Sequence, residues 1–316
     1  MHTKLALAPM AGVTDLAFRA LCREMTPLLT TSEMVSSRGI MYGDEKTLRL
    51  LALCPGERGD GGVQIFGHDP GCMAEAAVRA AELSGAAFVD INMGCPTPKI
   101  VKSGDGCALM ERPELAARII RAAADASPVP VSVKFRTGLD RGRINAVAFA
   151  QTAEQSGAFR LCVHGRTMAQ MYAGTADWDR VRDVAAAVRL PVIASGDIFS
   201  GRDALRVLRH TGASHAMIGR AAFGNPWIFR EAHAVLLGQE PPDGPSPAER
   251  VDMALRQYEM TVPYRGEEKA ALEARKFFAW YLKGLPYVHV YRPMLNEMRS
   301  RDDVLAAARA LRRDLS

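Results

Sequence analysis

Short apolar runs alternate with helical stretches from residue 5 to residue 218, and this alternation restricts the fold more than any other feature of the sequence. Eight of the runs have the length and apolar content of buried strands. They are Leu5 to Ala8, Leu28 to Thr31, Val63 to Phe66, Phe88 to Asn92, Val131 to Phe135, Leu161 to Val163, Val192 to Ala194 and Ala216 to Ile218. Strands that alternate with helices form βαβ units and a parallel sheet. Eight such units favour a closed (β/α)8 TIM barrel over an open doubly wound sheet.

The composition changes after Leu237. Residues 238–247 contain four prolines and two glycines, which predicts a linker. Beyond it, Pro247 to Glu259, Glu267 to Lys283 and Pro293 to Leu315 show only helical spacing, with a break expected near Ser300. The predicted organisation is a barrel over residues 1–237, a linker over 238–247 and a small all-helical domain over 248–316.

Composition excludes several classes of protein. No apolar run approaches the roughly 18 residues of a membrane span, and the N-terminus lacks the charged-then-apolar pattern of a signal peptide. The six cysteines form no Cys-x-x-Cys pair, which argues against a zinc site and against a disulfide scaffold. The net charge of +5 permits an anionic partner without requiring one. We expect a cytoplasmic, metal-free protein with no contact to a membrane, and we take a monomer as the working expectation.

A loop rich in glycine and proline follows the fourth expected strand. It carries Asn92, Cys95 and Lys99, and Pro96 and Pro98 stiffen it. Most free cysteines pack as small hydrophobic residues, and we assign that role to Cys107. Polar neighbours on both sides of Cys95 favour a reactive thiol there instead.

Polar or glycine-rich segments end nearly all the other strands as well. The candidate residues are Pro9, Met10 and Ala11 after the first strand, Gln64 in the third, Lys134 in the fifth, His164 and Arg166 after the sixth, Ser195, Gly196 and Asp197 after the seventh, and Gly219 and Arg220 after the eighth. Taken singly, each has an ordinary structural explanation. Together they place polar groups at one rim of the barrel, which is where barrel enzymes have their active sites.

The last two strands predict a phosphate site. Barrels often hold phosphate on backbone N–H groups of the loops after strands seven and eight, near a short extra helix. Gly196 and Gly219 allow close approach, Arg220 adds charge, and residues 221–229 are the expected short helix. A phosphorylated cofactor is therefore expected.

Basic and aromatic side chains are interleaved in the tail. Arg275 and Lys276 adjoin Phe277, Phe278, Trp280 and Tyr281. Such mixtures suit an RNA backbone and unstacked bases. Phe277, Trp280 and Tyr281, at helical spacing, are equally compatible with a hydrophobic core.

Five ordered motifs resemble the tRNA-dihydrouridine synthases, most closely the bacterial B-type branch. They are APMAGVTD at 8–15, DINMGCP at 90–96, VKFRTG at 133–138, VHGRT at 163–167 and MIGR at 217–220. The match runs from residue 5 to 230 nearly without gaps and continues more weakly through Ala274 to Lys276 and Trp280 to Leu282.

The resemblance implies an FMN-dependent barrel with a helical tRNA-binding domain, which reduces uridines of tRNA to 5,6-dihydrouridine with NADPH as reductant. It implies that Cys95 is the catalytic acid and that Asn92 orients the uracil. We further expect Lys99, Arg166, Arg275 and Lys276 to bind the substrate. The resemblance assigns the flavin to Pro9, Met10, Ala11, Gln64, Lys134 and His164, and the FMN phosphate to Ser195, Gly196, Asp197, Gly219 and Arg220. Ser195 departs from the family, which usually has Asn at that position.

Two other functions remain open at this stage. One is an FMN-dependent dehydrogenase for a free dihydropyrimidine such as dihydroorotate, which would share the barrel, the flavin and a loop cysteine. The other is a non-catalytic tRNA-binding module. Activity on free pyrimidines would favour the first, and a protein without bound flavin would favour the second.

Overall fold

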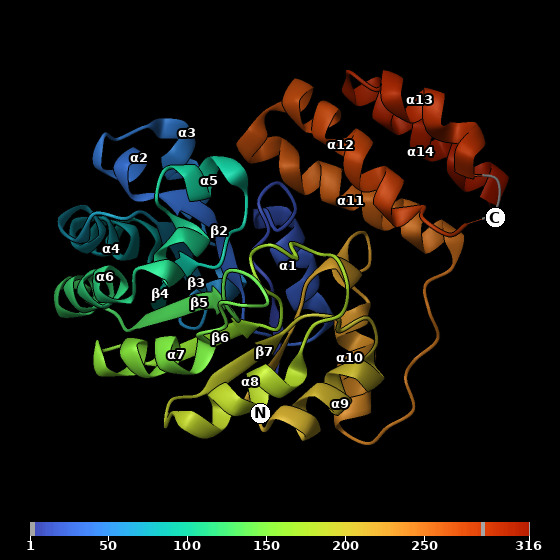
Figure 1. The fold of residues 1–316 in the computed structure, drawn as a ribbon. Coiled ribbons are helices and arrows are strands. Elements are labelled where there is room, and N and C mark those ends of the chain that lie inside the picture. Colours follow the sequence, from blue (N-terminus) through green and yellow to red (C-terminus); the bar gives the residue numbers. More distant parts are fainter. Residues whose placement is uncertain (1–3, 286–287, 316) are drawn as a thin grey trace.

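The centre of the protein is a parallel sheet of eight strands that alternate with helices (Figure 1). The computed structural model describes residues 4–285 and 288–315. The strands are β1 (Leu5–Leu7), β2 (Thr31–Ser36), β3 (Gly62–Phe66), β4 (Phe88–Met93), β5 (Val131–Arg136), β6 (Arg160–His164), β7 (Val192–Ser195) and β8 (His215–Ile218).

The sheet returns upon itself. Its order is β1-β8-β7-β6-β5-β4-β3-β2, and the free edge of β1 meets Leu29, just before β2. The Leu7 N–H donates to the Leu29 carbonyl at 2.9 Å, and the Leu29 N–H donates to the Leu5 carbonyl at 3.0 Å. The predicted TIM-barrel class is therefore confirmed.

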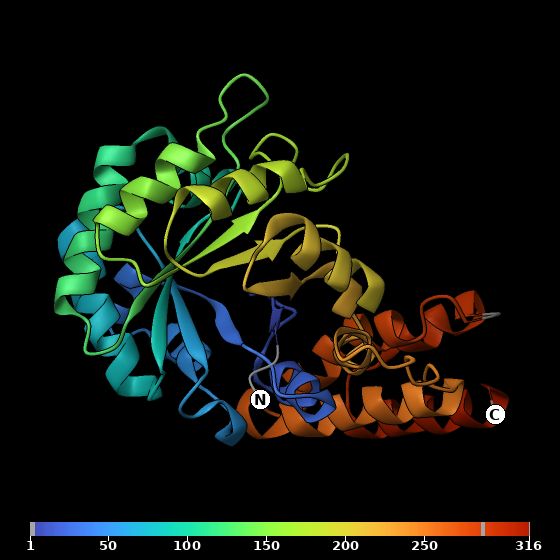
Figure 2. The ribbon, with the colours of Figure 1, turned by 90° about the horizontal axis from the view of Figure 1, so that it is seen from below.

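Helices cover the outside of the sheet (Figure 2). The helices of the barrel part are α1 (Leu16–Met25), α2 (Ser37–Met41), α3 (Glu45–Leu48), α4 (Pro70–Ser84), α5 (Pro98–Lys102), α6 (Pro113–Ala126), α7 (Ala146–Gln155), α8 (Trp178–Ala187), α9 (Gly201–Thr211) and α10 (Ile228–Leu236). Short 3-10 turns lie at Arg49–Leu51, Pro55–Glu57, Gly106–Glu111 and Arg220–Ala222. Asp15, Asp69, Asp177 and Ser200 cap four of the helices by accepting backbone N–H groups.

Two predicted boundaries are wrong. The second strand runs over Thr31–Ser36 and not over residues 28–31, because it begins with three polar residues and so lacks a continuous apolar run. The short helix expected over residues 221–229 is only a 3-10 turn at Arg220–Ala222, and α10 begins at Ile228. Gly224 has a φ of +61°, and Pro226 has no N–H to donate, so a helix cannot run through this segment.

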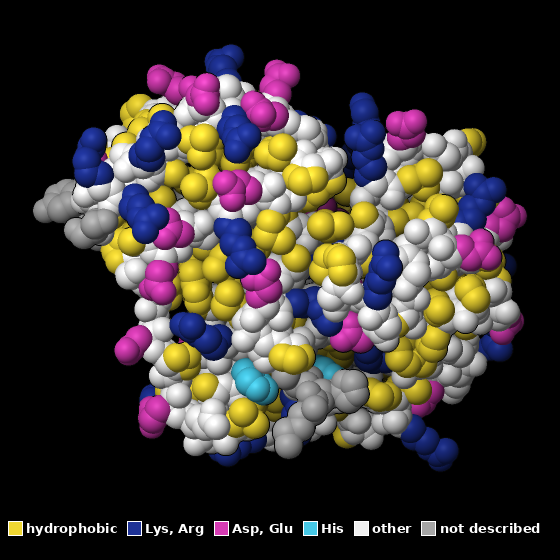
Figure 3. Space-filling model, turned by 180° about the vertical axis from the view of Figure 1, so that it is seen from behind, with side chains coloured by type: hydrophobic (Ala, Val, Ile, Leu, Met, Phe, Trp, Pro, Cys, Tyr) yellow, Lys and Arg dark blue, Asp and Glu magenta, His cyan; other side chains and the backbone are white. Residues whose placement is uncertain are grey.

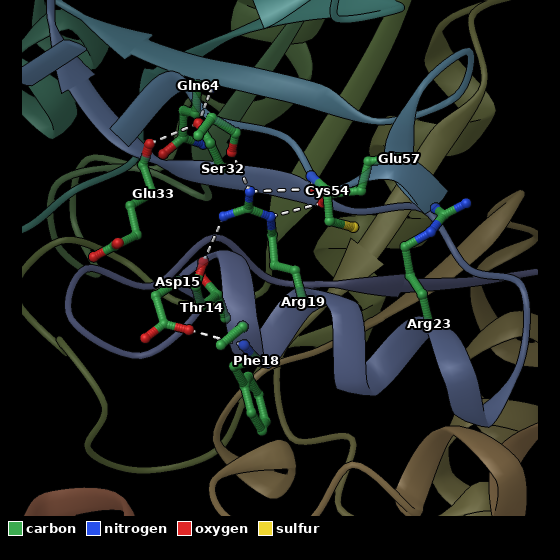
Figure 4. Close-up of polar contacts among 12 residues, drawn as sticks. Thr14, Asp15, Phe18, Arg19, Arg23, Ser32, Glu33, Cys54, Glu57 and Gln64 are labelled. Carbon is green, nitrogen blue, oxygen red and sulfur yellow. Dashed lines mark hydrogen bonds and ion pairs between the residues drawn. The ribbon is translucent and has the colours of Figure 1, made fainter. Parts of the chain in front are cut away.

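A buried ion pair fastens α1 to the segment between β2 and β3 (Figure 4). Arg19 Nε lies 2.7 Å from Glu57 Oε1, and the same guanidinium donates to the Thr14 and Ala52 carbonyls. Burial alone would raise the pKa of Glu57, but Arg19 holds it below its ordinary value. Because both side chains are fully buried, loss of either partner would leave a charge unpaired in the interior.

The chain beyond residue 246 is helical. It comprises α11 (Pro247–Arg265), α12 (Glu267–Tyr281), a 3-10 turn (Val288–Tyr291), α13 (Arg292–Glu297) and α14 (Arg301–Leu315). These helices enclose a second hydrophobic cluster, separate from that of the barrel, to which Phe277, Phe278 and Tyr281 contribute. The core interpretation is therefore confirmed for Phe277 and Tyr281, whereas Trp280 is only partly buried against this cluster. The division into domains at residues 237 and 248 stays a prediction.

The helical tail packs against the barrel beside α1 and α10 (Figure 2). Arg256 on α11 pairs with Glu24 on α1 at 2.7 Å. The Trp280 ring on α12 lies 4.8 Å, centroid to centroid, from Phe223, and Trp227 is buried within the tail cluster. The tail thus adjoins the segment that follows β8.

No helix among the described residues is long and apolar enough to cross a membrane. The face opposite to that of Figure 1 carries lysine and arginine side chains interspersed with aspartate and glutamate (Figure 3). A surface of mixed charge gives no strong field of one sign, so that face is a poor candidate for a nucleic-acid interface.

The contact between barrel and tail predicts a large cost for Gly224→Ala. A Cβ on Gly224 would lie 2.4 Å from backbone atoms of Trp280 and Tyr281. We expect about 1 kcal/mol of backbone strain and a further cost of about 1–3 kcal/mol from overpacking. The free energy of unfolding, measured in urea, checks this expectation.

Gly238→Ala is the matched control. Gly238 has a φ of +73° and nothing within 4 Å of its Cβ position, so only the strain applies. Equal losses of stability in the two variants would show that the Gly224 contact does not join tail and barrel tightly.

Candidate functional site

A cavity of about 530 Å³ opens at the carboxyl ends of the strands. Most of the residues proposed from the sequence line it. They are Pro9, Met10, Ala11, Gln64, Asn92, Cys95, Lys134, His164, Arg166, Ser195, Gly196, Asp197, Gly219 and Arg220. Lys99, Arg275 and Lys276 are not among the lining residues. The volume of the cavity falls within the range of small-molecule and cofactor sites.

Backbone hydrogen bonds hold Cys95 at the edge of this cavity. The Cys95 N–H donates to Asn92 Oδ1 at 2.9 Å, and the Cys95 carbonyl accepts from the Cys107 N–H at 3.0 Å. Gly106 has a φ of +58°, and a Cβ there would lie 2.7 Å from the Cys95 carbonyl oxygen. The Cys95 thiol, half-buried, lies 3.3 Å from Thr97 Oγ1. Cys107 is fully buried, as expected for a packing residue.

Cationic side chains gather along one wall. Lys134 and Arg136 come from β5, Arg166 follows β6, and Arg220 follows β8. The Lys134 ammonium has no hydrogen-bond or ion-pair partner within the described part of the chain, so it is available to a ligand carbonyl or anion. Burial, reinforced by these cations, lowers the pKa of His164 well below its ordinary value. His164 is therefore a neutral imidazole at pH 7.

The loops after β7 and β8 form a polar corner. Asp197 has a φ of +53° and accepts from Arg166 Nη2 at 2.7 Å, from the Ala176 N–H at 2.7 Å and from Arg220 Nη2 at 3.1 Å. The Asp197 carboxylate is thus engaged by protein donors. If Asp197 contacts a phosphate, it does so through its backbone N–H and not through its carboxylate.

Glycines leave room at the same corner. A Cβ on Gly196 would lie 2.7 Å from the Ala176 Cβ and 3.0 Å from the His164 ring, so this position requires glycine. A Cβ on Gly219 would only touch Ala8 and Met10, at 3.6 and 3.7 Å. The absent Cβ of Gly219 therefore leaves space inside the cavity rather than relieving a clash.

Several residues proposed to bind substrate make contacts within the protein. Arg166 is 1% exposed and donates to the carbonyls of Ala173 and Gly174 as well as to Asp197. Arg275 Nε donates to the Met298 carbonyl at 2.7 Å. Lys276 Nζ donates to the Gly12 carbonyl and lies 5.2 Å from the centre of the Trp280 ring. Lys99 lies on α5, the helix that follows the Cys95 loop.

Two exposed aromatic residues at the cavity were not proposed from the sequence. Tyr172 and Phe199 are 52% and 53% exposed, and the Arg220 guanidinium lies 5.0 and 5.5 Å from their ring centres. Both stand in the loops after β6 and β7. Their positions in loops at the carboxyl ends of expected barrel strands could have identified both residues as candidates from the sequence.

Comparison with known proteins settles the family. The model of the dihydrouridine synthase (Dus) family matches residues 6–315. The chain belongs to the dihydrouridine synthase family. The resemblance seen in the motifs is thereby confirmed, and so is the class of protein, an enzyme.

Dihydrouridine synthases of several bacteria are similar to this chain over about nine-tenths of their length. The tRNA-dihydrouridine synthase B of Pseudomonas aeruginosa is 42% identical over 310 residues, which cover 98% of this chain and 92% of the relative. That of Xanthomonas axonopodis pv. citri is 42% identical over 307 residues, covering 97% and 92%. A probable tRNA-dihydrouridine synthase of Rickettsia conorii is 40% identical over 298 residues, covering 94% and 90%.

The lowered pKa of His164 predicts how stability changes with pH. Below about pH 6.5 the unfolded chain binds a proton at this residue that the folded protein does not, so stability falls as the pH falls. In flavin-free protein, His164→Gln should reduce this dependence by up to about 1.4 kcal/mol per pH unit between pH 6.5 and 5.

Urea unfolding at several pH values measures this difference. The buried carboxyl groups Asp15, Glu33 and Asp90 have raised pKa values and act in the opposite direction, but they are present in both proteins and cancel in the comparison. Parallel curves for the wild type and the variant would contradict the neutral state of His164.

Proposed function

We propose that this member of the family is an FMN-dependent tRNA-dihydrouridine synthase, which reduces uridine in tRNA to 5,6-dihydrouridine with NADPH as reductant. The observation that carries the proposal is the position of Cys95. Its thiol lies at the edge of the one cavity that also contains the residues expected to bind flavin. The similarity to enzymes named tRNA-dihydrouridine synthase over nearly the whole chain supports it.

The residues of the cavity fit FMN. Gly219 leaves the space of a side chain free, and Arg220 supplies a cation beside it for the phosphate. Pro9, Met10 and Ala11 form an apolar wall for the ring system, and the free ammonium of Lys134 suits its carbonyl groups or developing negative charge. Ser195 is buried, and its carbonyl accepts from the Gly165 N–H at 3.0 Å, so it acts on the loop after β6 through its backbone. We propose that the family's Asn is dispensable here.

Bound FMN supplies a hydride to carbon 6 of the uracil. Carbon 5 then needs a proton, and Cys95 is the donor that we propose. A thiol positioned beside the reacting carbon can donate its proton as a general acid. Neutral His164 can donate a hydrogen bond to the uracil or the flavin without adding positive charge.

The mouth of the cavity suits an unstacked base. The target uridine must leave its stack to reach the flavin, at a cost of a few kcal/mol. The exposed rings of Tyr172 and Phe199, with Arg220 beside both, can stack with neighbouring bases and attract phosphate groups. These features support tRNA over a free pyrimidine as the substrate.

Cys95→Ala should lower the rate of dihydrouridine formation by at least about 10²-fold, because the proton donor is lost. Flavin absorbance should be retained, because the thiol is not needed to hold the cofactor. Nuclease digestion of tRNA followed by mass spectrometry measures the product.

Cys72→Ala is the control, since Cys72 lies on α4 and does not line the cavity. A Cys95→Ala protein that reduced tRNA at the wild-type rate would rule out Cys95 as the acid. Wild-type protein that acted on free dihydropyrimidines and not on tRNA would favour the dehydrogenase alternative.

A further inference from the structure

A chain of side-chain hydrogen bonds runs beneath Cys95 across β3, β4 and β5. Asp90 Oδ2 accepts from Gln64 Nε2 at 2.7 Å. Gln64 Oε1 accepts from Asn92 Nδ2 at 2.8 Å. Asn92 Oδ1 accepts from the backbone N–H groups of Cys95 at 2.9 Å and Gly94 at 3.2 Å.

The register of the barrel brings these side chains together. Gln64 is paired with Asp90 between β3 and β4, and Asp90 with Ser132 between β4 and β5. The Ser132 hydroxyl donates to Asp90 Oδ1, which leaves Oδ2 for Gln64. Asn92, two residues after Asp90, lies on the same face of β4 and nearer the cavity.

The direction of every bond in this chain is fixed by its two ends. Two backbone N–H groups at the upper end require an oxygen from Asn92, so the Asn92 NH₂ must face Gln64. Gln64 then directs its oxygen toward Asn92 and its NH₂ toward Asp90, so an acceptor is required at Asp90. The Asp90 side chain accepts from both Ser132 and Gln64, so it satisfies this requirement.

Burial makes errors in this chain costly. Gln64, Asp90 and Asn92 are 1%, 6% and 9% exposed. A reversed amide would set two donors or two acceptors against each other where water cannot relieve the conflict. A flip of Asn92 would also release the backbone of Gly94 and Cys95.

We propose that Asp90 is a positioning residue for Cys95: it fixes the orientation of the Gln64 and Asn92 amides, and through them the backbone that holds the thiol at the cavity. This inference rests on the proposed function for its catalytic meaning. It also gives Asn92 and Gln64 a role beyond contact with uracil and flavin.

Exchange of the two end groups tests the direction of the chain. In Asn92→Asp, the new carboxylate still accepts from the Cys95 N–H, but it also faces the Gln64 oxygen, so two acceptors oppose each other. If the Gln64 amide flipped, its oxygen would face the Asp90 side chain and the conflict would move there. Adding Asp90→Asn resolves the conflict, because the new amide donates to the flipped Gln64 and accepts from Ser132. Asp90→Asn alone keeps the original direction, because its oxygen accepts from Gln64 and its NH₂ donates to the Ser132 hydroxyl.

Single-turnover reduction of tRNA by the wild type, the two single variants and the double variant gives the first measurement. Misplacement of a reacting group by 1 Å can cost about 10²-fold, so Asn92→Asp should lose about that factor, and Asp90→Asn should stay within about threefold of the wild type. The double variant should recover at least about tenfold relative to Asn92→Asp. A double variant no faster than Asn92→Asp would overturn the proposal, since independent roles in uracil or flavin contact predict no recovery.

Alkylation of Cys95 by iodoacetamide gives a second measurement that needs no turnover. The rate at Cys95, located by peptide mass spectrometry, should change in Asn92→Asp and return toward the wild-type value in the double variant. Oxidation of the reduced flavin by molecular oxygen serves as a control for cofactor binding.

The outcomes separate the two proposals. Wild-type protein that forms no dihydrouridine would refute the proposed function, and the alkylation rates would still test the chain. Wild-type activity in all four proteins, with unchanged alkylation rates, would refute the role of Asp90 and leave the proposed function standing.

Discussion

The hydrogen bonds from the backbone of Gly94 and Cys95 to the Asn92 side chain fix the site, because they determine where the thiol stands. A loop that follows a strand has no neighbouring strand to hold it, and its backbone donors must find partners elsewhere. Here the side-chain oxygen of Asn92, a residue of β4 itself, accepts hydrogen bonds from two of these donors. The Cys107 N–H donates to the Cys95 carbonyl, so both backbone polar groups of Cys95 are hydrogen-bonded.

The rest of the barrel supports that arrangement. On one side of its interior the residues are small or apolar, with Ala6, Ala8 and Met217 in a cluster of their own. On the other side, β3, β4 and β5 carry the buried polar groups that hold the Cys95 loop. The cavity thus has an apolar wall for a flat ring and a polar wall for orientation. The tail contacts the loop after β1, since Lys276 Nζ donates to the Gly12 carbonyl.

Much of the fold could be predicted because buried parallel strands are short apolar runs, a pattern visible without neighbours. The second strand escaped because Ser32 and Glu33 are polar, and their burial depends on partners such as the Gly12 N–H, which meets the Glu33 carboxylate. The Cys95 loop was visible from its polar neighbours in the sequence. The opposite holds for Arg166, Arg275 and Lys276, whose charge suggested RNA contact while each donates to backbone carbonyls that no local pattern reveals. Asp90 lies inside a recognised motif, but only the register of three strands shows what its carboxylate does.

Mass spectrometry of tRNA from a strain that lacks this gene tests the central claim, that a uridine is reduced at the cavity beside Cys95, most directly. The account predicts that at least one uridine position loses the two added hydrogen atoms of dihydrouridine, and that purified, flavin-loaded protein with NADPH restores them. Identical tRNA masses in the two strains, with no reduction of that tRNA by the purified protein, would contradict it.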